Sequence, residues 1–229
     1  MAIIAKATND TDPLNSPNHN TQHGYMADAL NFGWIPVDGT FTYASATTIN
    51  ISAGGASVYT KGDKLRFQNN NSGTYLYAYI ITVADTLLTV VGDAVPNATL
   101  TDQEFSKILN PQGFPQFFAW TPTYTASSGT PTTVTTTTAR YSMIGKQVTL
   151  VMKFTITDKG TAAASLIYTT PITAAQVASG GGGYESAGTG TQLVTWLQDT
   201  THGYLAFYNA GTPWQNGHVH QITLVYEAA

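Results

Sequence analysis

Two histidines near the end of the chain, in the segment GHVHQI, are the first candidates for chemistry. His218 and His220 are separated by a valine, so in a strand both imidazoles project from the same face. Two ring nitrogens are half of a tetrahedral metal site, and six from three symmetry-related chains would make an octahedral one. Ile222, Leu224 and Tyr226 continue this face, which favours the other interpretation, a hydrogen-bonded pair without metal at the end of a core. No other cofactor is expected.

Signatures of catalysis are missing. The chain has no G-x-S-x-G elbow, no phosphate-cradling glycine loop before a helix and no H-E-x-x-H motif. Asp199 precedes His202 in a segment that is predicted to be a turn, where a bond from side chain to nearby backbone explains the pair better than a catalytic dyad. We therefore predict no enzymatic activity.

Aromatic residues beside polar ones raise the question of sugar binding. Carbohydrate sites combine an exposed aromatic plane with amides or hydroxyls that bond sugar hydroxyls. Tyr184 follows four glycines and Trp214 lies in NAGTPWQNG, so both are predicted to be loop aromatics, whereas Trp196 lies mid-strand and is expected in the core. Packing over the end of a sandwich is the competing interpretation. The candidate ligand-binding residues are Tyr184, Trp214, Tyr208 and Asn216.

Composition excludes several classes of partner. Only 10% of the residues are charged, the formal net charge is −4 and cysteine is absent. A nucleic-acid footprint, a disulfide framework and a thiolate metal site are therefore not expected. No stretch is apolar over the length of a membrane span, and the first residues are too short an apolar run for a secretory signal. We expect a chain made in a cytoplasm that does not insert into membranes.

The elements that must position these residues are strands. Abundant threonine and short β-rich runs predict an all-β fold of two small antiparallel modules, a barrel or sandwich over residues 31–109 and a jelly-roll-like sandwich over residues 123–229. Gly145 is predicted to form the turn of a hairpin. The returning strand has one apolar face, made of Val148, Leu150, Met152, Phe154 and Ile156. The glycine-rich residues 179–190 are predicted to be a mobile or specially shaped loop.

Two aromatic segments are candidates for contacts between modules or subunits. Three tyrosines share one face of TYLYAYIITV, so either that strand is buried on both sides or the face meets another subunit. Residues 110–122, NPQGFPQFFAWTP, are too rich in proline for a helix or central strand and too aromatic for a solvated linker, which predicts a stiff apolar joint. The candidate interface residues are Tyr75, Tyr77, Tyr79, Phe114, Phe117 and Phe118.

Residues 1–30 differ from the rest because Asn, Asp and Pro favour turns over strand ladders. They are interpreted either as a disordered tail or as a docking arm that orders on a larger assembly. A short helix is predicted from about Thr21 to Leu30.

Three stretches together resemble bacteriophage virion proteins. DPLNSPNHNTQH resembles their N-terminal attachment segment, and GWIPVDGTFTYASATTINIS through NPQGFPQFFAWTPTY resembles a β module of phage tail-fibre and head-fibre proteins. TVTTTTARYSMIGKQVTLVMKFTIT resembles the jelly-roll-like tip domain that often follows. The resemblance covers nearly the whole chain.

The resemblance implies a non-enzymatic homotrimer on the exterior of a virion, attached to tail or capsid proteins through residues 1–30. One implied function is a receptor-binding tail fibre or spike that adsorbs to a host glycan through the second module. The alternative is a head fibre or decoration protein that grips the capsid. Because the chain has no extended shaft like that of long fibres, a compact spike or a capsid decoration is also implied. A bacterial carbohydrate-binding module is a third, remoter alternative.

Overall fold

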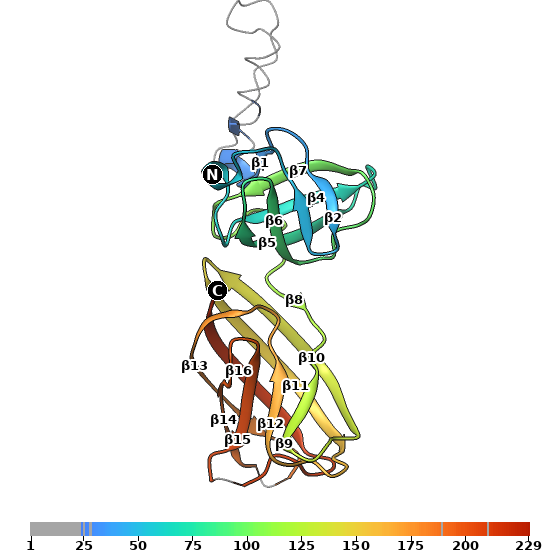
Figure 1. Ribbon diagram of the computed structural model, residues 1–229, viewed down its shortest axis with the longest axis vertical. Helices are drawn as coiled ribbons and strands as arrows, with labels where there is room; N and C mark the ends of the chain where they lie inside the picture. The colour runs from blue at the N-terminus through green and yellow to red at the C-terminus, as the bar shows by residue number, and fades with distance from the viewer. Residues whose placement is uncertain (1–23, 25, 28, 189, 210) are drawn as a thin grey trace, which may run out of the picture. The chain divides into compact units, whose positions relative to one another are not determined.

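The computed structural model describes residues 24, 26–27, 29–188, 190–209 and 211–229. Strands make up 54% of the chain and helices 5%, so the all-β prediction is confirmed. The chain divides into two compact units, Met1–Pro115 and Gln116–Ala229, each built on one curled antiparallel sheet (Figure 1).

Most of the predicted attachment arm, residues 1–30, lies outside the described residues. Those that are described from residue 24 onward are helical, and the helix continues to Phe32. Gly33 follows it with a φ of 77°, a left-handed conformation that glycine adopts without strain, and its N–H donates to the carbonyl of Ala29. A glycine therefore ends this helix.

The first unit has a seven-stranded sheet in the order β1-β7-β4-β5-β6-β3-β2. Its elements are β1 (Ile35–Pro36), β2 (Thr42–Ser45), β3 (Thr48–Asn50), α2 (Gly55–Val58), β4 (Lys64–Asn69), β5 (Tyr75–Val83), β6 (Leu87–Gly92) and β7 (Leu100–Ser106). The inner face forms one hydrophobic core, which includes Phe41, Ile49, Leu65, Phe67, Ile80 and Leu88.

One side chain connects β7, which neighbours the edge strand β1, to the residue that precedes the other edge strand, β2. The edge strands β1 and β2 are separated only by residues 37–41. The amide of Gln103 on β7 accepts a hydrogen bond from the N–H of Phe41 at 2.6 Å and donates to the carbonyls of Phe41 and Leu100 at 3.0 and 2.6 Å. The side chain thus takes the place of a strand peptide where the sheet curls round.

The tyrosine face of β5 is covered by residues of its own unit. The Phe114 ring lies 4.9 Å from that of Tyr79 and 5.7 Å from that of Tyr77, and Trp34 lies 6.2 Å from Phe114. Of the two interpretations, burial on both sides therefore holds for the middle of this strand, residues 78–80. The prediction that Tyr79 and Phe114 lie at an oligomer interface is wrong, because both are buried against each other; Tyr75 is half-buried.

The second unit has a nine-stranded sheet in the order β8-β10-β11-β16-β13-β14-β15-β12-β9. Its strands are β8 (Phe118–Ala119), β9 (Tyr124–Ser128), β10 (Thr133–Ile144), β11 (Gln147–Asp158), β12 (Ala163–Thr169), β13 (Ala174–Glu185), β14 (Gln192–Leu197), β15 (His202–Phe207) and β16 (Val219–Ala228). All neighbouring strands pair antiparallel.

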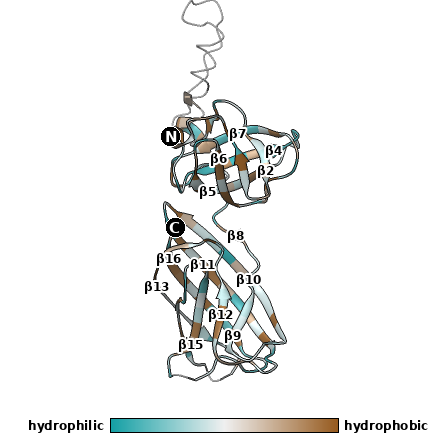
Figure 2. Ribbon diagram, in the orientation of Figure 1, coloured by the Kyte–Doolittle hydropathy of each residue, from teal (hydrophilic) through white to brown (hydrophobic). Residues whose placement is uncertain are grey.

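Alternation along the strands builds the core of the second unit. Hydrophobic and hydrophilic residues alternate along β10 and β11 (Figure 2). The predicted apolar face of β11 is buried as expected, and Leu150 and Met152 pair with Leu224 and Ile222 of β16. The hairpin turn is confirmed, with Gly145 at a φ of 58°. The opposite face of this sheet points away from the core.

The prediction that the glycine-rich segment forms a loop is wrong for residues 180–183, which lie inside β13; residues 181–183 pair with β14 on one side and with β16 on the other. A Cβ on Gly181 would collide with the carbonyl oxygen of Thr223, and one on Gly183 with that of Gln221. The close approach of β16 therefore requires glycine at these two inward positions.

The two parts of the predicted joint, residues 110–122, pack on different units. In the first part, the Trp34 indole N–H donates to the carbonyl of Gln112 at 2.8 Å. In the second part, Phe118 starts β8 and lies 5.9 Å from the ring of Tyr141. Phe118 is buried, so its prediction as an oligomer contact is wrong; Phe117 is exposed.

Candidate functional site

The outward face of the second sheet holds a groove of about 400 Å³ across β10, β11, β16 and β13. Strand pairing aligns its lining in two rows. One row is Thr138, Lys153, Gln221 and Tyr184, and the next is Arg140, Val151, Thr223 and Gly182. Because neighbouring strands lie about 4.8 Å apart, Lys153 on β11 and Tyr184 on β13 are separated across the sheet by about 10 Å.

Glycine forms one wall of this groove without a steric need for it. A Cβ on Gly182 would lie 3.4 Å from the carbonyl oxygen of Leu193, an ordinary contact, and one on Gly180 would meet nothing within 4 Å. These outward glycines differ from the inward pair at 181 and 183, which the close approach of β16 requires. The missing side chains leave the sheet backbone open beside Tyr184.

Two of the predicted ligand-binding residues lie on this face. Tyr184 is 49% exposed and belongs to β13, not to a loop as predicted. Tyr208 is 75% exposed and follows β15; its N–H donates to the carbonyl of Gln192, which is the cross-strand partner of Tyr184. The backbone therefore brings two exposed tyrosines to either side of one amide, an arrangement suited to stacking sugar rings and bonding their hydroxyls.

The other two predicted ligand-binding residues are engaged elsewhere. Trp214 is 0% exposed, and its indole N–H donates to the carbonyl of Ser165 at 3.2 Å. It offers no free aromatic plane, so its prediction as a ligand contact is wrong. Asn216 is exposed, but its side-chain carbonyl accepts the N–H of Lys159 at 2.8 Å and thereby fixes a turn.

Trp196 is an aromatic residue of this face that sequence reasoning placed in the core. It is 40% exposed and packs on Tyr204 with ring centroids 4.5 Å apart. The signal was present in the strand, because Leu193, Thr195 and Leu197 alternate with it and are all buried. Because successive side chains of a strand point to opposite faces, Trp196 lies on the outward face.

His218 and His220 lie at the end of the core, as one of the two interpretations predicted. Both are buried, and their ring centroids are 6.3 Å apart. Burial lowers the pKa of His220 to about 4, although a hydrogen bond to the carbonyl of Pro213 opposes the shift. The imidazole of His220 is therefore neutral at pH 7 and donates through Nε2 to that carbonyl, 3.0 Å away.

The carboxylate nearest to the histidines organises a loop. Glu185 is fully buried and lies 3.8 Å from Nδ1 of His218. Burial raises the pKa of Glu185, but hydrogen bonds from the N–H groups of Ala187, Gly188 and Gly190, with His218, outweigh burial and leave the pKa below its ordinary value. Within the described residues, no three His, Asp or Glu side chains are placed to hold a metal ion.

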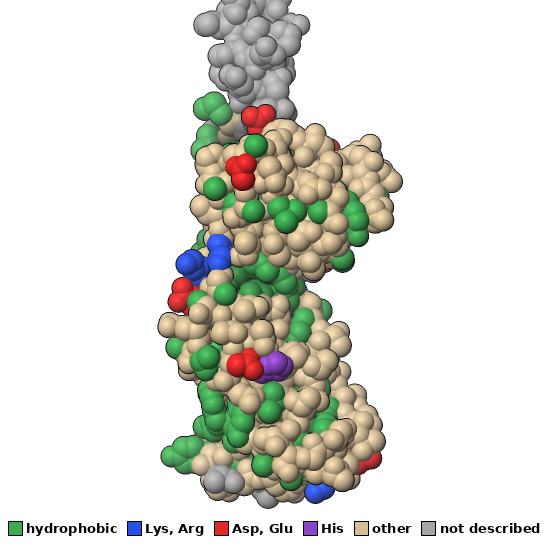
Figure 3. Space-filling view, viewed as in Figure 1, with side chains coloured by type: hydrophobic (Ala, Val, Ile, Leu, Met, Phe, Trp, Pro, Cys, Tyr) green, Lys and Arg blue, Asp and Glu red, His purple; other side chains and the backbone are tan. Residues whose placement is uncertain are grey.

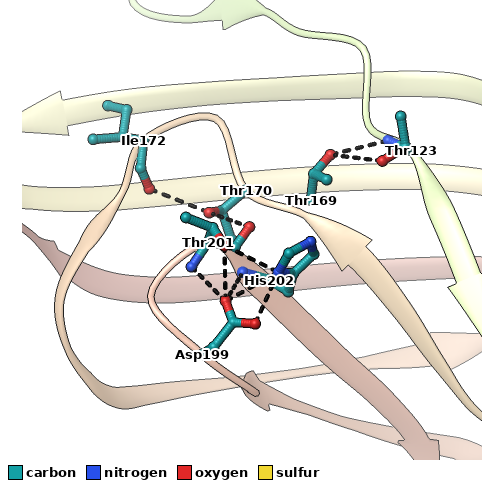
Figure 4. Close-up of polar contacts among 7 residues, drawn as sticks. All are labelled: Thr123, Thr169, Thr170, Ile172, Asp199, Thr201 and His202. Atoms are coloured by element: carbon teal, nitrogen blue, oxygen red, sulfur yellow. Dashed lines mark hydrogen bonds and ion pairs between the residues drawn. The ribbon is translucent and has the colours of Figure 1, made fainter. Parts of the chain in front are cut away.

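The turn between β14 and β15 contains Asp199 and His202, the pair that the sequence predicts to be a turn motif. Oδ1 of Asp199 accepts the N–H groups of Thr201 and His202, and Nδ1 of His202 lies 2.9 Å from Oδ2 (Figure 4). Burial raises the pKa of Asp199, but these bonds outweigh burial and lower it to about 2. The Thr201 hydroxyl also contacts Nδ1, whereas a catalytic triad needs nucleophile and carboxylate on opposite ring nitrogens. The pair is a local turn motif.

Charged side chains cover little of the face of the molecule drawn in Figure 3. Among the described residues, none of the helices has the length and apolar character needed to span a membrane.

Comparisons with protein-family models, with curated proteins and with solved structures find no significant match to this chain. The fold and the open groove define an all-β protein of two antiparallel units with a site on a sheet face. The function proposed below therefore rests on the geometry of the groove and on the resemblance of the sequence to bacteriophage virion proteins.

Proposed function

We propose that this chain is a non-enzymatic adhesion protein on the exterior of a bacteriophage particle, whose second unit binds a glycan of the host surface. The observation that carries the proposal is the open groove beside Tyr184, bordered by the hydroxyl of Thr138 and the amide of Gln221. An aromatic plane next to amides and hydroxyls is the combination by which binding proteins hold sugars. The location on the phage tail is what the resemblance to phage fibre proteins implies.

The lining of the groove favours binding without turnover. Glycoside hydrolysis uses two carboxyl groups across the scissile bond. Neither aspartate nor glutamate is among the described residues that line the groove. A bound glycan would therefore be held and not cleaved.

The oligomer expected from the resemblance is a homotrimer attached through residues 1–30 to tail or capsid proteins. Since Tyr79, Phe114 and Phe118 pack within their own units, a trimer contact would use other surfaces. Phe117 and the partly exposed Tyr75 and Tyr77 remain candidates. Light scattering after gel filtration gives the mass in solution, and a monomer would contradict the trimer.

The test of the proposed function is adsorption of the purified chain to host cells. Tyr184→Ala is expected to weaken adsorption about tenfold, because one stacking contact is lost. Gly182→Gln, which fills the groove at a position where a side chain fits, is expected to do the same. Tyr184→Trp keeps the aromatic plane and should adsorb normally. Ile144→Ala, which shortens another exposed side chain in the β10–β11 turn, is the control.

A chain that neither adsorbs to cells nor blocks adsorption of the phage would overturn the receptor-binding role. An electron-microscopy map that placed the protein on the capsid would then favour the alternative, a head fibre or decoration protein.

A further inference from the structure

Two cations border the groove on the side opposite Tyr184. Arg140 on β10 and Lys153 on β11 are both exposed. Strand pairing sets Arg140 opposite Val151 and Lys153 opposite Thr138, so the two cations are diagonal neighbours on one face, about 7–8 Å apart. Neither takes part in an ion pair within the described chain.

The four acidic residues of the second unit are committed elsewhere. Glu227 lies 3.9 Å from Lys146, and Asp158 accepts the N–H two residues along its own turn. Glu185 is buried under its loop, and Asp199 is bonded within the β14–β15 turn. The groove is therefore locally positive in a chain whose net charge is −4. Like charges on adjacent strands repel, and an anion between them would remove that cost.

The guanidinium of Arg140 is already oriented. Its Cζ lies 5.2 Å over the ring of Phe117, a cation–π contact that restrains the side chain. The edge of a stacked guanidinium keeps its N–H donors free, and their fork matches the two oxygens of a carboxylate.

We infer that the groove binds an acidic sugar, meaning a pyranose ring that carries a carboxylate, as uronic and sialic acids do. The ring stacks on Tyr184, the carboxylate is bound between Arg140 and Lys153, and Gln221 and Thr223 bond the hydroxyls. The open backbone at Gly182 admits the ring to the sheet surface. The inference rests on the proposed function and adds the chemical class of the ligand.

Calorimetry with the full chain tests the ligand class, using oligogalacturonate and oligosialic acid, each compared with its own methyl ester. Each ester keeps the ring of its acid and removes the charge. At least one of the two acids is expected to bind about tenfold or more tightly than its ester, as one charged hydrogen-bonding contact provides. The advantage should shrink in high salt, because salt screens exposed charges. Which acid binds distinguishes the two sources of the carboxylate.

Variants assign the effect to the groove. Lys153→Gln and Arg140→Gln are each expected to weaken binding of the acid about tenfold while leaving the ester unchanged. Lys159→Gln removes the same charge outside the groove and should have no effect. An ester that binds as tightly as the acid, or acids that do not bind a chain still adsorbing to cells, would overturn the inference.

Adsorption to cells separates this inference from the proposed function. If adsorption is lost in Tyr184→Ala but unchanged in Lys153→Gln and Arg140→Gln, the ligand is a neutral glycan and only the inference fails. If no groove variant affects adsorption, the proposed function of the groove fails. If Gly182→Gln changes the mass of the assembly in solution, the groove is a contact between copies of the chain, which also overturns the inference.

Discussion

The outward face of each sheet has a lysine and a tyrosine in one row, but the pair is covered in the first unit and open in the second. In the first unit, Lys64 lies across from Tyr79 on the neighbouring strand, and Phe114 covers both. In the second unit, Lys153 and Tyr184 line one row of the sheet, and the space above them is an open groove. The same pair of residue types thus packs in the interior of the first unit and is accessible to a ligand in the second.

The covered face shows the cost of closing such a surface. Burial lowers the pKa of Lys64, which the nearby Asp63 carboxylate partly offsets. The ammonium lies 5.8 and 5.9 Å from the rings of Tyr79 and Phe114, contacts that compensate some of its lost hydration. The exposed cations of the second unit have no such cost, because water or a ligand can solvate them.

The largest expected effect comes from removing one tryptophan from each unit. Trp34 is 0% exposed, so Trp34→Ala should lower the free energy of unfolding of the first unit by about 4 kcal/mol. The partly exposed Trp196 stabilises the second unit less, and Trp196→Ala should cost under about 1.5 kcal/mol. Urea denaturation followed by amide NMR signals of each unit gives both values. Equal losses would contradict the contrast between covered and open faces.

Acid should destabilise the second unit more than the first. The folded-state pKa of His220, about 4, lies below the ordinary value of 6.5, so the unfolded chain binds this proton first as pH falls. The contribution of neutral His220 to the free energy of unfolding is fully present above pH 6.5. It is lost progressively toward pH 4, by up to about 3 kcal/mol. The same NMR signals, followed in urea at several pH values, measure the loss.

His220→Gln is the control for this dependence on pH. Glutamine cannot be protonated in this window but can still donate to the carbonyl of Pro213. The variant should be less stable at neutral pH and show a shallower slope between pH 6.5 and 4. An unchanged slope would assign the acid effect to other groups.

The smallest expected effects separate the two faces of the glycine strand. Gly183→Ala should destabilise the second unit by about 2 kcal/mol, because its Cβ meets the backbone of β16. Gly182→Ala should change stability by less than about 0.5 kcal/mol, since its Cβ meets only an ordinary contact. Thermal unfolding of the two variants measures the difference. A large loss in Gly182→Ala would show that the fold requires this glycine.

Alternation made part of the fold predictable. The buried and exposed faces of β11 follow from the sequence, because apolar and polar side chains alternate along the strand. The turn at Gly145 follows because glycine adopts a positive φ without strain. The glycines of β13 have no side chain and carry no such signal, so a paired strand looked like a loop. The placement of Tyr184 was missed for the same reason.

Long-range contacts were not predictable. Phe114 covers Tyr79 from a segment far along the chain, and no local pattern shows that pairing. The polar neighbours of Trp214 suggested exposure, yet its indole N–H has a partner in Ser165, on a strand distant in sequence. Local composition predicts which residues suit a site, and tertiary packing decides which of them are free.

The amide of Gln103 has a consequence for behaviour at high concentration. A sheet edge with free N–H and C=O groups is a template on which another chain can add a strand. Gln103 occupies both the N–H and the carbonyl of Phe41, directly before an edge strand of the first unit. A neutral side chain thereby occupies the N–H and the carbonyl next to the start of β2, so that another chain could not pair with this peptide.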